Sequence, residues 1–287
     1  MRRGFVEIGR RLDGKRVSVT QLRFAAPRQT ASAPRRLRWR VRYFTLPASH
    51  SGAIAAVEDR EQALGYWVDK PLLRQADAVV PMTVAAWSGT IIESEDAFAA
   101  DVRNWSVAAR SELHDKLDRL CALAVEKGVT GRLLLRPHAR HVLSDWHTCA
   151  RFMMQRETAG DSRTGLLVDP AAMLTEQMLT RSAEHLERTF EQVGLALRGE
   201  SGRPGWIGGV VVCNLRRGDR GGAPVAGDPL GYDEGAALVA CELDHRDGLL
   251  DAKLIARLTA AHLTPATPIV FVGGQTAGAH QRTVMES

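Results

Sequence analysis

The chain from residue 77 onwards alternates short apolar runs with amphipathic segments that are long enough to form helices. Three of these runs, 133–135, 165–168 and 209–213, are apolar throughout. Strands of this kind pair in parallel, because the helices that connect parallel strands also cover both faces of their sheet. The alternation therefore predicts an α/β protein with a parallel sheet.

The same pattern predicts where the elements fall. Strands are expected over 78–85, 133–135, 165–168, 209–213 and 268–272, and helices over 106–127, 147–155, 175–193 and from Asp251 onwards. Gly128 and Gly194 follow two of the helical stripes and are natural stops, while Asp145 and Asp251 suit N-cap positions. Residues 216–229 are polar and rich in Gly and Pro, so we expect a loop there.

Chain length separates the two architectures that such a sheet can form. No G-x-G-x-x-G motif follows a strand, which disfavours a doubly wound dinucleotide-binding sheet. The chain has 287 residues, and an α/β barrel usually takes about 250. In the first third, strands can be placed at 5–9, 16–23 and 38–46, but the segments between them are poor helices. We therefore expect an α/β protein of the (β/α)8-barrel type that is irregular or incomplete in its N-terminal quarter.

Positive charge is concentrated near the N-terminus. Residues 1–46 hold 13 of the 38 Lys and Arg residues but only two of the 33 acids. The cluster 35–40 places Trp39 among arginines, which could contact phosphates and stack a base, so nucleic acid or an acidic protein is a candidate partner. The alternative is a solvated basic face. We divide the chain into a basic segment 1–46, either the start of the barrel or a loosely ordered extension, a barrel body 47–274 and a polar tail 275–287.

Cysteine usage and hydropathy favour a reducing, aqueous compartment. The four cysteines lack C-x-x-C spacing, which disfavours a zinc ribbon or a disulfide scaffold. No apolar stretch approaches the roughly 18 residues of a transmembrane helix, and no signal-peptide pattern opens the chain. We expect a cytoplasmic protein with no membrane partner, and the sequence leaves its oligomeric state open.

In a barrel, functional residues gather at the C-terminal ends of the strands. Asp169, with His138, is the cluster suited to moving a proton, so these two are the candidate catalytic residues. The candidate ligand-binding residues are Arg136, His141, Trp146, Asn214 and Arg216. No Walker, H-E-x-x-H or G-x-S-x-G motif occurs, so nucleotide hydrolysis, zinc proteolysis and serine hydrolase chemistry lack support.

The order of these segments resembles that of xylose-isomerase-like sugar phosphate isomerases and epimerases. Residues 113–140 look like the part of that family in which a helix leads to an apolar strand followed by Glu-Pro, and 165–169 is similar to its next strand, which ends in Asp. Residues 210–216 occupy the place of its His-bearing strand, and 245–255 and 269–272 resemble its last helix start and closing strand. The likeness covers 77–274 and implies a TIM barrel of that type.

The resemblance implies a divalent cation at the barrel mouth, held by two Glu, one Asp and one His, which acts as a Lewis acid while carboxylates move a proton. At the matching positions this chain has Arg136 for the first Glu, Asp169 for the Asp, Cys213 or Asn214 for the His, and Val272 or a neighbouring glycine for the last Glu. One carboxylate beside a guanidinium does not hold a divalent ion, because catalytic sites need about three protein ligands. We expect no metal and no other cofactor.

Three functions are consistent with these features. The first is a divergent sugar phosphate isomerase-like or epimerase-like protein without metal-dependent catalysis, which binds a sugar or phosphorylated small molecule at the mouth. In it, Arg136 either anchors an anion or forms an internal salt bridge with Asp169. The second is a non-catalytic interaction protein that uses residues 1–46. The third is an active metal-dependent isomerase that recruits His138, His141 and Asp169 as ligands. The sequence does not decide whether the protein is an enzyme.

Overall fold

The computed structural model of the chain describes residues 43–46, 52–56, 65–68, 83–91, 101–198, 205–217, 238–264 and 266–272. All of them belong to the unit Trp39–Ser287, and for the first three ranges only the backbone is described. The strands expected at 5–9 and 16–23, most of the basic segment 1–46 and the tail 275–287 lie outside these ranges. The division into segment, body and tail stays a prediction.

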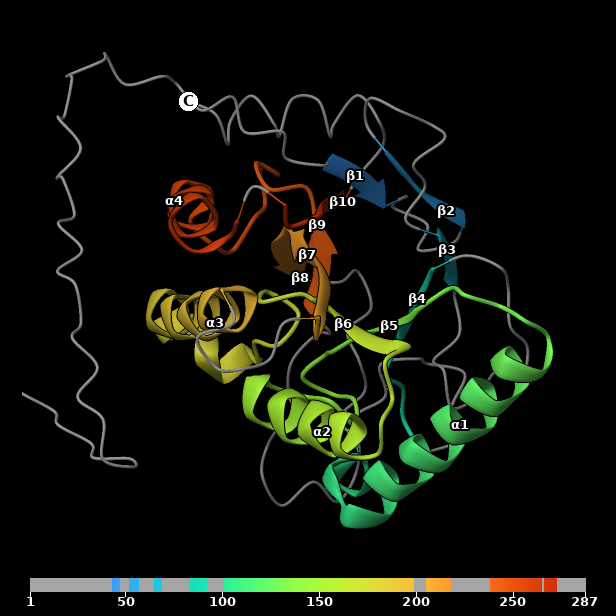
Figure 1. Ribbon diagram of the computed structural model, residues 1–287. Helices are drawn as coiled ribbons and strands as arrows, with labels where there is room; N and C mark the ends of the chain where they lie inside the picture. Colours follow the sequence, from blue (N-terminus) through green and yellow to red (C-terminus); the bar gives the residue numbers. More distant parts are fainter. Residues whose placement is uncertain are drawn as a thin grey trace, which may run out of the picture. The chain divides into compact units, whose positions relative to one another are not determined.

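Eight strands within the described ranges form a closed barrel (Figure 1). They are β1 (Tyr43–Leu46), β2 (Gly52–Ala56), β3 (Gly65–Val68), β4 (Val84–Trp87), β5 (Leu133–Arg136), β6 (Thr164–Val168), β7 (Ile207–Val212) and β10 (Ile269–Val272). Around the barrel they follow the order β1-β10-β7-β6-β5-β4-β3-β2, and every neighbouring pair is parallel except the two that involve β2. The predicted α/β barrel, irregular in its first part, is confirmed.

The irregularity has a simple cause in the length of two connections. Residues 47–51 join β1 to β2, and 57–64 join β2 to β3. Both connections are shorter than the dozen or so residues that a parallel crossover needs, so β2 runs antiparallel to both neighbours. The connection over 69–83 is longer, and β3 and β4 pair in parallel. The sequence analysis placed β1 within the strand expected at 38–46 but missed β2 and β3.

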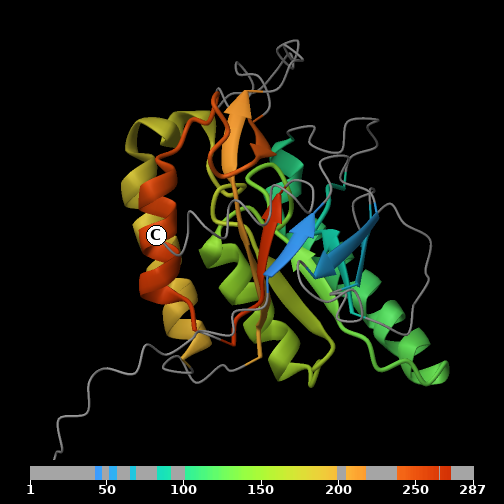
Figure 2. The ribbon, with the colours of Figure 1, turned by 90° about the horizontal axis from the view of Figure 1, so that it is seen from above.

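Within the described ranges, four α-helices flank the barrel on the side of β4, β5, β6, β7 and β10 (Figures 1 and 2). They are α1 (Val107–Glu126), α2 (Trp146–Thr158), α3 (Ser182–Leu197) and α4 (Ala252–His262). The side chains at three- and four-residue spacing on α1, such as Leu113 and Leu117, are fully buried, as the sequence predicts. Both expected N-caps are confirmed. The Asp145 carboxylate accepts from the Thr148 N–H at 2.8 Å in a capping box, and the Asp251 carboxylate accepts from the Lys253 N–H at 2.9 Å.

The helix expected over 175–193 differs from the prediction at both ends. It begins as the 3-10 helix η4 (Glu176–Arg181), and α3 then continues past Gly194 to Leu197. Gly194 is therefore not a helix stop. A Cβ there would lie 2.9 Å from the carbonyl oxygen of His262, so the glycine permits the close approach of α3 and α4, which lie side by side in both views (Figures 1 and 2).

A hairpin that the sequence did not predict follows β7. Strand β8 (Asn214–Arg217) pairs antiparallel with β9 (Leu238–Cys241), with Asn214 opposite Cys241. The loop expected over 216–229 is thus wrong at its first two residues, and 218–229 lies outside the described ranges. The sheet of β8 and β9 is half exposed, so β8 can end in two arginines and lacks the apolar run by which the other strands were predicted. The strand expected over 78–85 also differs at its ends, because β4 spans Val84–Trp87 and does not include Thr83, while 78–82 lies outside the described ranges.

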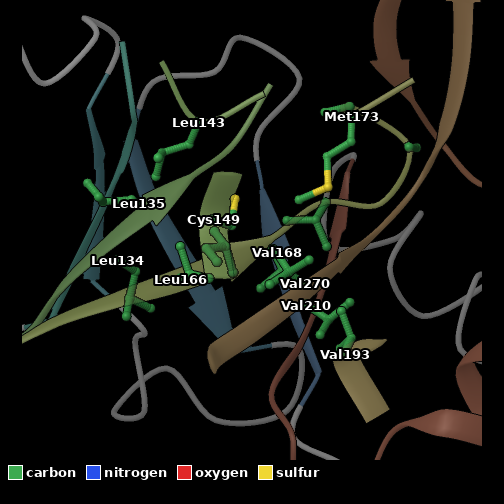
Figure 3. Packing of buried hydrophobic residues seen from close by; sticks show 14 of the residues in the cluster. Leu134, Leu135, Leu143, Cys149, Leu166, Val168, Met173, Val193, Val210 and Val270 are labelled. Carbon is green, nitrogen blue, oxygen red and sulfur yellow. The ribbon is translucent and has the colours of Figure 1, made fainter. Parts of the chain in front are cut away.

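The barrel and the inner faces of its helices enclose one apolar core (Figure 3). Leu134 projects from β5 towards β7, two strands away, where a Cβ at Gly208 would lie 2.5 Å from its side chain. Small residues on β7 therefore leave room for the large ones on β5. Because strand side chains alternate between faces, Arg136 lies on the same face of β5 as Leu134. Among the described helices, none is both long and apolar enough to cross a membrane.

Candidate functional site

Consecutive strand ends bring four polar or aromatic side chains together at the mouth of the barrel. Trp87 ends β4 and Arg136 ends β5, and the two are register partners. Asp169 directly follows β6, and Cys213 directly follows β7. Because these four strands are parallel neighbours in the order β4-β5-β6-β7, their C-terminal ends share one edge. We call these four residues the mouth cluster.

An ion pair between Arg136 and Asp169 forms the centre of the mouth cluster. The Arg136 Nε donates to Asp169 Oδ2 at 2.9 Å, and Nη2 donates to the same oxygen. Both side chains are 0% exposed. Of the two alternatives that the sequence left for Arg136, the internal salt bridge is the one that forms. The carboxylate therefore already occupies the Nε and Nη2 donors of the guanidinium.

The second carboxylate oxygen of Asp169 is engaged as well. Oδ1 accepts from the backbone N–H of Ala172 at 3.0 Å and lies 3.6 Å from the sulfur of Cys213. Burial, followed by the nearby carboxylate, raises the pKa of Cys213 well above its usual value, so the thiol keeps its proton and donates it towards Asp169. Four protein donors thus occupy a group that has about four lone-pair sites.

Trp87 covers the cation of the pair, and the sequence analysis missed it. The guanidinium carbon of Arg136 lies 4.1 Å from the centroid of the indole ring, a cation–π contact. The imidazoles of His138 and His141 meet the same ring edge-on, at centroid distances of 5.6 and 5.5 Å. The available signal was an aromatic residue immediately after an apolar run, but the strand was expected to end at Ala85.

Both histidines lie in the segment between β5 and α2 and accept hydrogen bonds from the backbone. The Arg140 N–H donates to His138 Nδ1 at 3.2 Å, and the Gly89 N–H donates to His141 Nδ1 at 3.4 Å. Burial, and then the charges of His141, Arg140 and Arg136, lower the pKa of His138 well below its ordinary 6.5. At neutral pH its ring is therefore uncharged, with Nδ1 accepting and the proton on Nε2.

Asn214 is turned away from the mouth cluster. Its Nδ2 donates to the carbonyls of Leu243 and Leu250 at 3.0 and 2.9 Å, and its Oδ1 accepts from the Leu250 N–H at 2.8 Å. A Cβ at Gly248 would lie 2.5 Å from Nδ2, so the glycine is needed where this loop passes the amide. Of the two residues that could stand at the position of the His in the resemblance, Cys213 and not Asn214 is the one that faces Asp169.

The remaining sequence candidates lie apart from the ion pair. Trp146 is the first residue of α2 and packs, half-buried, against the apolar core. Arg216 lies in β8 and is also half-buried. As ligand-binding residues, both stay predictions.

A pocket opens beside the mouth cluster. It is partly open to solvent, and its lining residues are Trp87, His138, Ala172, Leu174, Leu215, Leu238, Val239 and Ala240. The β8–β9 hairpin contributes half of these residues. The fully buried Arg136 and Asp169 do not line the pocket, so a ligand in it would meet Trp87 and His138 instead.

The residues at the mouth do not fit the divalent cation that the resemblance implies. The two lone-pair-bearing oxygens of Asp169 already accept from Arg136, Ala172 and Cys213, and the guanidinium places a positive charge where a ligand would be needed. Val272, at the end of β10, is buried and has no donor atom on its side chain. Within the described ranges, no three His, Cys, Asp or Glu side chains are grouped so as to hold a metal ion.

Comparisons with known proteins found matches among solved structures alone. No protein-family model matches the chain, and no curated protein matches it. Among solved structures, a xylose isomerase-like TIM barrel protein from Mycobacterium smegmatis in complex with magnesium shows 10% identity and a TM-score of 0.39, over 71% of this chain and 60% of that one. The chain is similar in structure to xylose isomerase-like TIM barrels.

Two further structures show the same level of likeness. The probable 3-DHS dehydratase AsbF from Bacillus anthracis, described as involved in petrobactin synthesis, is 13% identical with a TM-score of 0.40 over 71% of this chain and 62% of that one. Protein SMc04130 from Sinorhizobium meliloti 1021 is 14% identical with a TM-score of 0.33, over the same shares. The chain spans about three fifths of the length of each of the three. Likeness at this level assigns neither a family nor an activity to it.

Proposed function

We propose that this protein is a metal-independent barrel that binds a small molecule at its mouth and does not perform the metal-dependent isomerisation of the sugar isomerases it resembles. The observation that carries the proposal is the buried Arg136–Asp169 pair. In this pair, the guanidinium of Arg136 supplies to Asp169 the positive charge that a metal cation would otherwise supply. The carboxylate is then a structural anion, held by donors on both of its oxygens.

The mouth residues are better arranged for binding than for moving a proton. Asp169 could act as a base only after releasing Arg136, and breaking a buried ion pair typically costs about 3–5 kcal/mol. His138 keeps its proton on Nε2, because Nδ1 accepts the Arg140 N–H, so the neutral ring offers a donor rather than a base. The catalytic roles predicted for Asp169 and His138 therefore form no part of the proposal.

Metal analysis and calorimetric titration with Mn²⁺ test the proposal. Protein purified without chelator should contain no stoichiometric divalent metal, and Mn²⁺ should give no saturable heat. Arg136→Gln removes the competing cation from Asp169 and should allow only weak Mn²⁺ binding, because one carboxylate supplies fewer than the three or so ligands of a tight site. Arg132→Gln is the matched control, because Arg132 directly precedes β5, at the opposite end of the strand from Arg136, and donates to the Gly205 carbonyl at 2.5 Å. It should leave Mn²⁺ binding unchanged.

Two results would contradict the proposal. One is a divalent ion bound to the wild type in a one-to-one ratio, which would instead support a metal-dependent isomerase with rearranged ligands such as His138, His141 and Asp169. The other is Mn²⁺-dependent interconversion of an aldose and a ketose phosphate by the wild type that the Arg136→Gln variant loses.

A further inference from the structure

We propose that the hairpin of β8 and β9 is a lid over the pocket beside the mouth cluster, and that an ion pair between Arg217 and Glu176 holds this lid closed. The inference rests on the proposed function, because it concerns how a small molecule would enter the site proposed there. Both strands of the hairpin are described, and the ion pair lies at the end of the hairpin that is farther from the barrel.

The pocket has one wall on the hairpin and one on the body of the barrel. Leu215 and residues 238–240 belong to the hairpin, and the other lining residues are Trp87, His138, Ala172 and Leu174. The width of the pocket therefore depends on where the hairpin stands.

The segment that follows β6 is fixed to the barrel. The backbone N–H of Ala172 donates to Asp169 Oδ1 at 3.0 Å, and the Ala172 carbonyl accepts from the Ala139 N–H at 2.8 Å. Asp169 is itself bound to Arg136 in the buried ion pair. Opening the pocket is therefore a movement of the hairpin and not of this wall.

The hairpin is attached firmly at its base. One residue separates β7 from β8, so the hairpin rises directly from the mouth edge of the barrel (Figure 2). There the Asn214 amide donates to the carbonyls of Leu243 and Leu250 at 3.0 and 2.9 Å, and the Leu215 carbonyl accepts from the Leu249 N–H at 2.8 Å. The base can therefore stay in place while the far end moves.

An ion pair fastens the far end of the hairpin to the other wall. Arg217 ends β8 and is the register partner of Leu238, the first residue of β9. Its Nη2 lies 2.5 Å from Oε1 of Glu176, which begins η4 two residues after Leu174 of the pocket lining. The pair thus joins the two walls at the outer end of the pocket. We call it the latch.

The latch is the weaker of the two attachments. The side chains of Arg217 and Glu176 are 64% and 35% exposed, whereas Asn214 is buried. Salt screens an ion pair of this exposure, which changes an equilibrium by only about two- to fivefold. Residues 238–240 are half-buried, so little apolar surface opposes the movement. The far end can therefore open while the barrel stays folded.

Alkylation of a thiol placed in the fixed wall of the full-length protein tests the inference. Ala172→Cys is the reporter, because Ala172 lines the pocket and is 4% exposed, and Leu174→Cys is a second reporter in the same wall. In either background, Glu176→Gln should raise the rate of reaction with iodoacetamide about two- to fivefold. Raising NaCl to about 0.5 M should raise the rate with the latch intact, but not in Glu176→Gln.

A second change to the latch separates opening from a direct effect of charge on the reporter. Arg217→Gln should also raise the rate about two- to fivefold, although it removes a charge of the opposite sign. The two substitutions would shift the pKa of a nearby thiol in opposite directions, so an increase in both reports access. Exchanging the charges, with Glu176→Arg and Arg217→Glu together, should return the rate towards its original value.

Two controls accompany these variants. Glu187→Gln removes the partner of Arg257 at 3.8 Å, an exposed ion pair between α3 and α4, and should leave the rate unchanged. Peptide mass spectrometry follows the native Cys149 in the same samples. This thiol is fully buried beneath α2, so its labelling reports unfolding of the protein and should stay slow in every variant.

The outcomes separate this inference from the proposed function. The lid is wrong if Glu176→Gln leaves the rate unchanged, if Glu187→Gln raises it equally, or if Cys149 labelling rises in proportion. It is also wrong if Arg217→Gln slows the reaction. In each of these cases a metal-free wild type would still leave the proposed metal independence standing. Stoichiometric Mn²⁺ in the wild type would overturn the proposed function whatever the labelling rates are.

Discussion

Strand β6 carries a buried aspartate–arginine pair near each of its ends, and the two pairs differ in instructive ways. Asp161 precedes the strand and pairs with Arg156 at 2.6 Å, while Asp169 follows it and pairs with Arg136. Each carboxylate also has a cysteine sulfur nearby, Cys121 at 3.7 Å and Cys213 at 3.6 Å. An aspartate, an arginine and a cysteine are therefore grouped twice, once near each end of one strand.

The pair before the strand joins two residues that are close in sequence, and it is linked to the protein surface through a second carboxylate. Asp161 accepts from the N–H groups of Arg163 and Thr164 at 2.8 and 3.1 Å and from the Thr164 hydroxyl at 2.5 Å, so it organises the turn that leads into β6. Its partner Arg156 also binds Asp118, whose side chain is 65% exposed. Although burial raises the pKa of Asp161, the bonds from Thr164 and Arg156 hold it below its ordinary value.

The pair after the strand is long-range and sealed. Arg136 and Asp169 come from neighbouring strand ends and are both 0% exposed, with the indole of Trp87 against the guanidinium. Within the described residues, the partners of Asp169 are Arg136, Ala172 and Cys213, and none of them donates a hydroxyl as Thr164 does to Asp161. The comparison indicates that the mouth pair depends more heavily on its arginine than the turn pair does.

The largest expected effect breaks the mouth pair. Arg136→Met should lower the free energy of unfolding by about 3–5 kcal/mol, because it leaves a buried carboxylate without its cation. Arg156→Met should cost less, about 1–3 kcal/mol, because Asp161 keeps its bonds from Arg163 and Thr164. Urea unfolding at pH 7 measures both changes.

A second substitution serves as the control for that experiment. Adding Asp169→Leu to Arg136→Met removes the stranded charge and should restore much of the lost stability, since a buried pair is often no better than an apolar one. The comparison of the two pairs would be wrong if Arg156→Met were the more damaging variant, or if Arg136→Met were harmless.

An intermediate effect is expected on acidification, because a histidine lies near each pair, the buried His138 at the mouth and the half-buried His114 at the turn. Burial, together with the charges of His141, Arg140 and Arg136, lowers the pKa of His138, and burial lowers that of His114, whose carbonyl accepts from Arg156. The unfolded chain takes up these protons from pH 6.5 downwards and the folded protein does so only at lower pH. Their contribution is thus complete above pH 6.5 and is lost as the pH falls.

Thermal unfolding between pH 7.5 and 5.5 measures this loss. Each site can contribute at most about 1.4 kcal/mol per pH unit below 6.5, which corresponds to a few degrees in Tm. His138→Gln should flatten the pH dependence more than His114→Gln, because the pKa of His138 is lowered further. An unchanged slope in His138→Gln would show that the mouth histidine is not the titrating group.

How far the site follows from the sequence can be seen at individual residues. The apolar runs, the α1 stripe and the Asp145 and Asp251 caps are local signals, and the structure confirms them. The rule that barrel chemistry lies at strand ends correctly brought Arg136 close to Asp169, and their ion pair was one of two stated alternatives. These features follow from periodicity and from strand order.

Other features depend on contacts that no local signal carries. Gly194 has the sequence appearance of a helix stop, but it serves an approach to His262, which is distant in the chain. Asn214 was a ligand-binding candidate because it follows a strand, yet its amide is engaged by carbonyls of a later loop. The hairpin was missed because β8 ends in two arginines. Trp87 was missed because its role depends on the contact with Arg136, which comes from another strand.

The smallest expected effect concerns the two cysteines of the compared pairs. Cys213→Ala and Cys121→Ala should each change the free energy of unfolding by about 1 kcal/mol or less, since a thiol is a weak donor. Burial raises the pKa of both thiols, so iodoacetamide should react slowly with either at pH 7. Peptide mass spectrometry should find Cys121, which is half-buried, labelled before the fully buried Cys213. The reverse order would show that the mouth opens more readily than the turn.

The four hydrogen bonds of the Asn214 side chain have a consequence for how the rim behaves. Its amide joins the base of the β8–β9 hairpin to the segment that leads into α4, with partners at Leu215, Leu243 and Leu250. Loosening that part of the rim would mean giving up all of these bonds in a place that water does not reach. A molecule bound at the proposed mouth site would therefore meet a surface whose shape is already set, and binding would cost little in ordering this part of the rim.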